Sequence, residues 1–315
     1  MDQTTQIINR VLPILLLIGL GYWIRRRSFL PEATVDDLKK MAANLALPAV
    51  LFLTFLEIDL QANYLGLIVL TFGLCVALYG LGVGLQRVLN VRHAYFPFLM
   101  TGFEFGMLGF SLFGSAYGLE NFHYIAITDL GHELFIWFVF LALLLMRRDG
   151  LRGPGELVRG FLSSPVILAI LLGLAGNALG LAENLGTWPV TGGIVAALAF
   201  LRDLTIPLIL IIVGYGIKLD RHGLREAALV IGVRLALLIP LALIFNAVIV
   251  RGLLGLERGF EVALFVLLVL PPPFIVPLYM RGDEDEKRYV NNVLTLYTVV
   301  TIIIFSLVFI FTPPL

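Results

Sequence analysis

Residues 262–277, Val-Ala-Leu-Phe-Val-Leu-Leu-Val-Leu-Pro-Pro-Pro-Phe-Ile-Val-Pro, place four prolines inside an apolar run. Proline lacks a backbone N–H and clashes with the preceding turn, so three in succession break a regular helix. Inside a membrane such a break is tolerated only where protein or a water-filled cavity covers the freed backbone groups. The stretch therefore predicts a membrane protein whose chain is interrupted within its own core.

The rest of the 315-residue chain favours the same class. Hydrophobic residues make up 59% of it and charged residues only 14%, against about 25% charged residues in a typical soluble domain. About 20 apolar residues cross a bilayer core about 30 Å thick. We predict an all-α polytopic membrane protein that forms one unit over residues 1–315. Its ten predicted transmembrane helices are 7–24, 38–56, 64–86, 95–117, 124–146, 165–182, 192–217, 227–250, 259–280 and 291–311.

The distribution of charge predicts the orientation. Of the 22 Lys and Arg residues, 17 are assigned to one side of the predicted spans and four to the other, while Arg234 falls inside the eighth span. The positive-inside rule assigns the basic side to the cytoplasm. Both termini then lie outside the cytoplasm of a plasma (inner) membrane. The net charge of zero gives no indication of a nucleic-acid partner. The N-terminus has neither the basic start nor the cleavage site of a signal peptide.

The single cysteine, Cys75, excludes an intramolecular disulfide and a cysteine-rich metal site. The expected partners are the bilayer, a small substrate and a coupled cation, H⁺ or Na⁺. We expect no cofactor and no structural metal.

Two halves of five spans each, 1–146 and 165–315, flank a basic linker over 147–164. An odd number of spans per half gives the halves opposite orientations. Asn44-Leu45-Ala46-Leu47-Pro48 in the second span corresponds to Asp203-Leu204-Thr205-Ile206-Pro207 in the seventh, and each proline is expected to interrupt its helix. The glycine-rich fourth span corresponds to the proline-rich ninth. The pattern predicts inverted repeats with broken, crossing helices 4 and 9.

Inverted repeats with broken helices indicate a secondary transporter whose site lies near the midplane. Half-helix N-termini there suit an anion, and the freed carbonyls suit a cation. The alternative is that these glycines and prolines only kink packed helices.

Acidic residues inside the spans are candidate coupling sites. Glu104, near the midpoint of the fourth span, is either a proton or cation coupling site or a protonated, structurally hydrogen-bonded acid. Asp203 either couples transport or caps a bent helix, and its neighbour Arg202 is expected to point to a different face. Asp129, His132 and Glu133 share a helix face, either as a proton relay or as a structural pair hydrated near the interface.

Short motifs along the whole chain resemble the auxin efflux carrier family. They are Val11-Leu12-Pro13, Gly19-Leu20-Gly21-Tyr22, the Asn44–Pro48 motif, and a fourth-span pattern. The family shows Asn-x-Gly-x-x-Gly-x-Pro and a later Tyr-Gly, and here Glu104 to Ser111 and Tyr117-Gly118 occupy that register. The family includes bacterial permeases described as malonate or malate carriers and the plant auxin exporters.

The resemblance implies the fold of bile-acid:sodium symporters and sodium/proton antiporters, with a scaffold part, a transport part and crossed helices 4 and 9. It also implies alternating access, a carboxylate substrate and a possible homodimer. The expected ion-coupling residues are Glu104, Asp203 and Asp129. The expected substrate-binding residues are Asn44, Glu104, Gly106, Gly109, Ser111, Pro271, Pro272, Pro273 and Pro277.

Two departures from the family pattern bear on the substrate. Glu104 stands where the family has Asn, and Ser111 stands where it has Pro. An ionised Glu104 would repel a carboxylate, so we expect it to be protonated or paired with a cation when substrate binds. A neutral, cationic or zwitterionic substrate is the other interpretation.

Other function classes are less well supported. The chain has no His-Glu-x-x-His motif, and Gly109–Gly114 lacks the spacing of a hydrolase nucleophile elbow, so we do not expect an enzyme. A cation/proton antiporter that uses Glu104 and Asp203 is the main alternative, and a membrane sensor is a weaker one.

Overall fold

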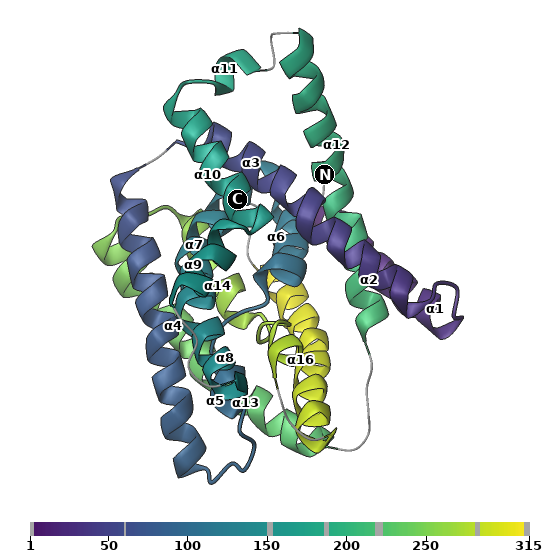
Figure 1. The fold of residues 1–315 in the computed structure, drawn as a ribbon, viewed down its shortest axis with the longest axis vertical. Helices are drawn as coiled ribbons and strands as arrows, with labels where there is room; N and C mark the ends of the chain where they lie inside the picture. Colours follow the sequence, from purple (N-terminus) through teal and green to yellow (C-terminus); the bar gives the residue numbers. More distant parts are fainter. Residues whose placement is uncertain are drawn as a thin grey trace. The chain divides into compact units, whose positions relative to one another are not determined.

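The computed structural model describes residues 3–59, 61–149, 154–185, 189–217, 223–280 and 284–311, and these are helical apart from their connections (Figure 1). They form two compact units, each built from segments far apart in the sequence. Unit 1 comprises Met1–Leu60, Gly106–His123 and Arg159–Ile217, and unit 2 comprises Gln61–Phe105, Tyr124–Val158 and Lys218–Leu315.

Unit 1 contains the first, second and seventh predicted spans as long helical segments, together with the sixth and the second part of the fourth. Its main helices are α1 (Gln3–Arg26), α2 (Glu32–Met41), the π-helical turn η1 (Ala42–Ala46), α3 (Leu47–Glu57), α6 (Phe110–Tyr117), α10 (Pro165–Ala178), α11 (Ala182–Leu185) and α12 (Pro189–Gly216). α12 packs along α1, α3 and α6, and α3 packs against α10.

Unit 2 contains the third, fifth, eighth, ninth and tenth predicted spans and the first part of the fourth. Its main helices are α4 (Ala62–Val88), α5 (Phe96–Leu99), α7 (Phe122–Phe135), η4 (Ile136–Phe140), α8 (Leu141–Asp149), α13 (Leu224–Phe245), η5 (Asn246–Leu253), α14 (Arg258–Val269), α15 (Val276–Tyr279) and α16 (Glu284–Phe311). α13, α14 and α16 pack against one another. The π-helical turn η2 (Phe105–Gly109) and the helix α9 (Pro154–Leu162) lie where the chain passes between units, and η3 (Leu119–Asn121) is a short turn of unit 1.

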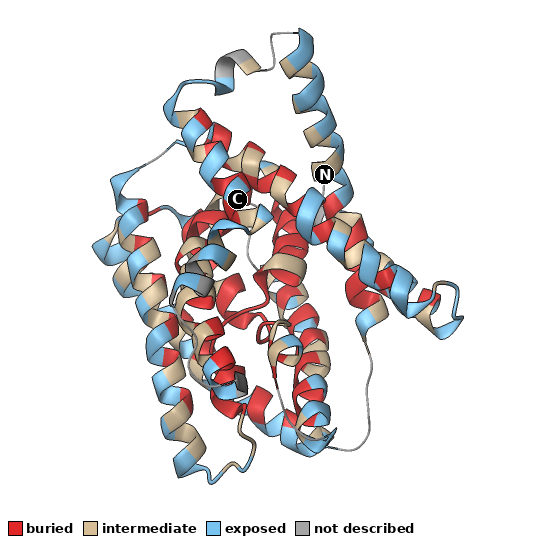
Figure 2. Ribbon diagram, in the orientation of Figure 1, coloured by how far each residue is buried: buried red, intermediate tan, exposed pale blue. Residues whose placement is uncertain are grey.

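Six helical segments within the described residues are long and apolar enough to cross a membrane. They are Glu32–Glu57, Ala62–Val88, Leu119–Arg147, Pro189–Gly216, Leu224–Leu253 and Glu284–Ile310. Large apolar side chains remain exposed along several of them, such as Leu65 and Val69 on α4 and Phe200 on α12 (Figure 2). Lipid is the medium that would cover such surfaces. The all-helical membrane class is therefore confirmed, and the ten-helix inverted repeat stays a prediction.

The expectation that Pro48 and Pro207 interrupt their helices is wrong. The segment Glu32–Glu57 is helical throughout, with the π-helical turn η1 just before Pro48, and Pro207 lies inside α12. A single proline removes only one backbone N–H, and a widened turn absorbs its ring. Three successive prolines remove consecutive donors, which is why the chain is broken at Pro271–Pro273 but not at Pro48 or Pro207.

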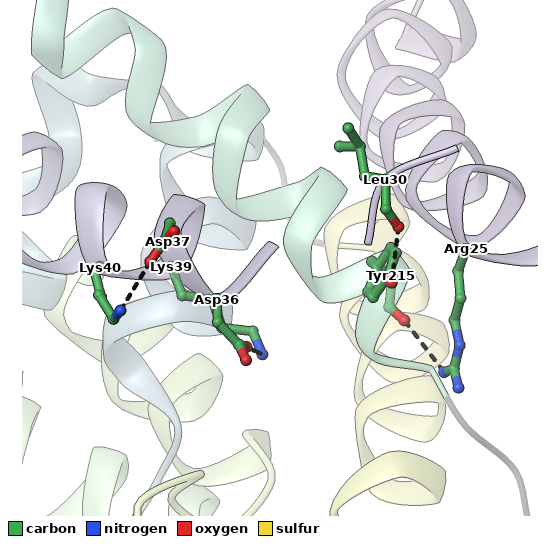
Figure 3. A network of polar contacts seen from close by, with 7 residues as sticks. All are labelled: Arg25, Leu30, Asp36, Asp37, Lys39, Lys40 and Tyr215. Carbon is green, nitrogen blue, oxygen red and sulfur yellow. Dashed lines mark hydrogen bonds and ion pairs between the residues drawn. The ribbon is translucent and has the colours of Figure 1, made fainter. Parts of the chain in front are cut away.

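The end of α12 is fixed to the loop after α1 by a polar network within unit 1 (Figure 3). The Nη1 atom of Arg25 donates to the carbonyl oxygens of Ile217 at 3.0 Å and Tyr215 at 3.3 Å. The hydroxyl of Tyr215 donates to the carbonyl of Leu30 at 3.2 Å. A guanidinium at a helix C-terminus satisfies carbonyls that have no partner in the helix and complements the helix dipole.

The exposed ion pairs in the same view, Lys39–Asp36 and Lys40–Asp37, each span 2.8 Å. They contribute little stability because solvent screens them.

Two glycines allow α1 and α12 to approach closely. A Cβ atom added at Gly21 would overlap the carbonyl oxygen of Ile211, and one added at Gly214 would overlap that of Ile18. Backbone cannot move away as a flexible side chain can, so these positions accept no side chain without separation of the helices. Gly19, two residues before Gly21, has nothing within 4 Å of such an atom.

We predict that Gly21→Ala and Gly214→Ala each destabilise the protein by about 1–3 kcal/mol, the usual cost of overpacking. Thermal unfolding in detergent, followed by tryptophan fluorescence, measures the effect. Gly19→Ala is the matched control on the same helix and should leave the unfolding temperature unchanged. Equal unfolding temperatures for all three variants would contradict the close packing of α1 on α12.

Candidate functional site

The fourth predicted span is broken near its middle. α5 ends at Leu99, residues 100–104 are not helical, and the helix resumes at Phe105. Every residue from 95 to 105 is buried (Figure 2). Gly102 has φ +67°, a left-handed conformation that glycine adopts without strain. The break is therefore a built feature of the core of unit 2.

The ninth predicted span is broken by its prolines, as expected. α14 ends at Val269, and α15 begins at Val276. Pro271, Pro272 and Pro273 are buried, whereas Pro277 lies in the first turn of α15 and is half-buried. The carbonyl of Val269, at the end of α14, accepts a hydrogen bond from Thr301 Oγ1 at 2.8 Å.

The first break, residues 100–104 of the fourth predicted span, and the second break, residues 270–275 of the ninth, meet within unit 2. The backbone N–H of Glu104 donates to the carbonyl oxygen of Pro271 at 2.8 Å, and Phe274 N–H donates to Glu104 Oε2 at 2.6 Å. A Cβ atom added at Gly102 would lie 2.7 Å from Cγ of Pro273, so the chains touch there. Glu104, which is 8% exposed, thus joins the breaks through both its main chain and its carboxylate.

Arg234 on α13 is a second polar centre of this site. Its side chain is completely buried, and its Nη1 donates to the carbonyl of Leu99 at 2.6 Å while its Nη2 donates to that of Gly102 at 2.5 Å. Arg234 was not among the predicted site residues. It could have been found, because an arginine in the middle of a membrane span is costly and marks a functional site.

A hydrogen-bonded pair on α7 supports the first break from another side. Asp129 Oδ1 lies 2.8 Å from His132 Nδ1, and both side chains are buried. Phe103 N–H donates to His132 Nε2 at 2.9 Å. Since Nε2 accepts, the ring proton of the neutral imidazole is on Nδ1, where it is donated to Asp129. The pair is therefore a buried structural support of the break, while its role as a relay and its position relative to the membrane interface stay predictions.

The other predicted site residues belong to unit 1. Gly106 and Gly109 lie on η2, and Ser111, on α6, donates within its own helix to the carbonyl of Met107 at 2.7 Å. Asn44 is exposed on η1. The structure thus brings together Glu104, Pro271 and Pro273 within one unit, and the participation of the unit 1 residues stays a prediction.

Asp203 contacts its neighbour Arg202. Its Oδ1 lies 3.1 Å from Nε of Arg202, and both side chains are exposed. Adjacent residues leave a helix in different directions, but the long arginine side chain folds back to its neighbour on an open surface. The two residues thus contact each other although they start from different faces of the helix, and a role of Asp203 in coupling stays a prediction.

We predict that His132→Ala destabilises the protein by about 1–3 kcal/mol, because it leaves the buried N–H of Phe103 without this acceptor. Thermal unfolding in detergent checks the effect, and His132→Gln, which keeps an acceptor and a donor, should recover part of the loss. His123→Ala, at a histidine near the start of the same helix, is the control. An unfolding temperature of His132→Ala equal to that of wild type would contradict the supporting role.

Two comparisons with known proteins indicate a relation to membrane transporters. Residues 6–153 match the sequence profile of a family described as membrane transport protein. A protein of Methanothermobacter thermautotrophicus, described as an uncharacterized transporter, is 28% identical over 239 residues, which cover 71% of this chain and 73% of the relative. The range 6–153 that matches the family profile includes the first break and Glu104. With its apolar spanning helices, the chain is a multi-pass membrane protein, and the match of residues 6–153 to the membrane transport protein family confirms the resemblance to a transporter family.

Proposed function

We propose that this protein is a secondary active transporter of a small organic anion that carries a carboxylate, working by alternating access around the crossed breaks. The proposal includes coupling to protons or sodium and a location in a plasma membrane with both termini outside the cytoplasm. The observation that carries it is the contact of two broken, buried segments at Glu104, Pro271 and Phe274.

Broken segments at membrane depth are costly unless protein covers them or they line a cavity. Each break ends one helix and starts another, so it leaves carbonyls on one side and N–H groups on the other. Partial positive charge at a helix N-terminus favours an anionic group. In this proposal the two breaks offer this combination near the midplane, where transporters of inverted-repeat type place their substrates.

Glu104 is the residue through which we expect protons to act. Its carboxylate already accepts a short hydrogen bond from Phe274 N–H. An ionised side chain at this place would repel an incoming carboxylate, whereas a protonated one could donate to it. Proton uptake by Glu104 therefore links substrate binding to pH in this proposal.

The alternative of cation/proton exchange through Glu104 and Asp203 has less support. Asp203 is exposed and paired with Arg202. A carboxylate paired with a permanent cation is less available to an exchanging ion. Glu104 instead contacts the backbone of the second break, which favours a role in recognition.

We predict that carboxylates bind purified wild-type protein more weakly as the pH rises from about 5 to 8, by about tenfold or more, which corresponds to about 1.4 kcal/mol. Glu104→Gln should bind them with little dependence on pH, because glutamine still accepts the Phe274 N–H but cannot ionise. The measurement is calorimetric or fluorescence binding of C3 and C4 dicarboxylates and an aromatic acid in nanodiscs.

Glu261→Gln is the matched control, because Glu261 lies at the start of the ninth segment, paired with Arg251, and outside the breaks. It should keep the pH dependence of wild type. If none of the carboxylates binds wild type at any pH, the anion proposal fails. Na⁺/H⁺ exchange in vesicles of the same preparation would then identify an antiporter.

A further inference from the structure

Arg234 is the one buried arginine side chain in the part of the chain that the structure describes, and the functions proposed above do not use it. It lies on α13 in the middle of the segment Leu224–Leu253, which is long and apolar enough to span a membrane. A full charge at this depth persists only where the protein supplies strong compensation. The groups that surround the guanidinium of Arg234 therefore indicate the role of its charge.

The hydrogen bonds of the Arg234 guanidinium go to backbone carbonyls at both breaks. The short ones reach Leu99 and Gly102, at the end of α5, and longer contacts of 3.4 Å reach Thr101 and Leu270. Leu270 directly follows α14, so the guanidinium donates to carbonyls that follow the ends of two helices, α5 and α14.

Two aromatic rings flank the same cation. The guanidinium carbon lies 5.0 Å from the ring centre of Phe103 and 5.4 Å from that of Tyr297. Cation–π attraction at these distances is strongest in a desolvated site. Arg234 thus occupies an environment of carbonyl oxygens and ring faces that suits a cation, although its buried Nε atom has no hydrogen-bond partner.

Carbonyls freed at the C-terminal ends of broken helices are the ligands that transporters of this type offer to a coupled cation. Hard alkali cations bind such oxygens, and a guanidinium is a permanently charged donor that binds them with directional hydrogen bonds. Only one cation can use the same carbonyls, so the two exclude each other.

We infer that Arg234 is a tethered cation that takes the place of a dissolved metal ion at the crossed breaks. Transport of the proposed anion then needs no Na⁺, because the positive charge between the two helix ends is part of the chain. This inference rests on the proposed function. Of the two coupling ions proposed there, protons and sodium, it retains only protons. It also makes Arg234 a positioning residue, which holds the carbonyls of the first break while Glu104 holds the Phe274 N–H of the second.

Removal of the side chain should turn the tethered site into one for dissolved cations. The probes are carboxylate binding in nanodiscs and thermal unfolding, each in NaCl, in millimolar guanidinium chloride, and in choline chloride of equal ionic strength. Wild type should give the same values in NaCl and choline. Arg234→Ala should bind carboxylate about tenfold or more weakly in choline. Guanidinium or Na⁺ should restore binding and raise its unfolding temperature, since choline is too large to enter.

Arg251→Ala is the matched control. Arg251 lies in the same spanning segment but is exposed and paired with Glu261, so its loss removes an equal charge without touching the breaks. It should behave as wild type in all three salts. Arg234→Lys keeps the charge but lacks the planar fork, and its binding should lie between wild type and Arg234→Ala with no response to guanidinium.

Three results would overturn the inference. One is a requirement of wild-type carboxylate binding for Na⁺, a measurement that needs no variant. Another is an Arg234→Ala protein with the carboxylate affinity of wild type. The last is an Arg234→Ala protein whose unfolding temperature responds equally to guanidinium and choline, which would make Arg234 a plain structural clamp.

The thermal readout separates this inference from the proposed function. If wild type binds no carboxylate, the anion proposal fails, yet a specific rise in the unfolding temperature of Arg234→Ala with guanidinium still supports the tethered cation. If Arg234→Ala is recovered folded only when guanidinium is present, the inference is supported. If it is not recovered under either condition, the Na⁺ independence of wild type and the salt response of Arg234→Lys decide the matter.

Discussion

The structure depends on the need to satisfy backbone polar groups where a helix stops inside an apolar environment. An N–H or carbonyl without a partner at membrane depth costs several kcal/mol. Where the two breaks of unit 2 meet, Glu104 accepts an N–H of the second break, and its own N–H donates to Pro271. Arg234 donates to carbonyls of both breaks, and Thr301 and His132 each satisfy one further group. The charged residues of the core are therefore placed according to the backbone groups that the breaks expose.

The same constraint explains why the site can be both rigid and functional. The breaks are held by the carboxylate of Glu104 and the guanidinium of Arg234, which come from separate segments. They have few ways to rearrange without leaving one of these groups without its hydrogen-bond partners. In the proposed function, proton or anion binding at Glu104 would act on the group that joins the two breaks, so its effect would reach both helix ends at once. A change of state at this one side chain would then act on the backbone of two spans, as the proposed coupling of transport requires.

Much of the fold was predictable because lipid imposes strict rules on composition. The apolar runs, the break at the three prolines and the buried Glu104 all follow from length, hydropathy and the missing N–H of proline. Prediction failed where the outcome depended on small adjustments of geometry. At Pro48 a π-helical turn keeps the segment helical, and Pro207 stays within α12.

The sequence by itself determined that the chain is a helical membrane protein with a broken segment and an acid near it. These features are local, since each depends on residues that are neighbours along the chain. Only the tertiary structure decided which groups the acid meets and that Arg234 serves the same breaks, because Leu99, Gly102 and Leu270 come from segments more than thirty residues away from Arg234. Helix periodicity shows which side of a helix a residue occupies, but not which helix will face it. That choice is made by packing, where close approaches such as Gly102 on Pro273 and Gly214 on Ile18 leave room for one arrangement.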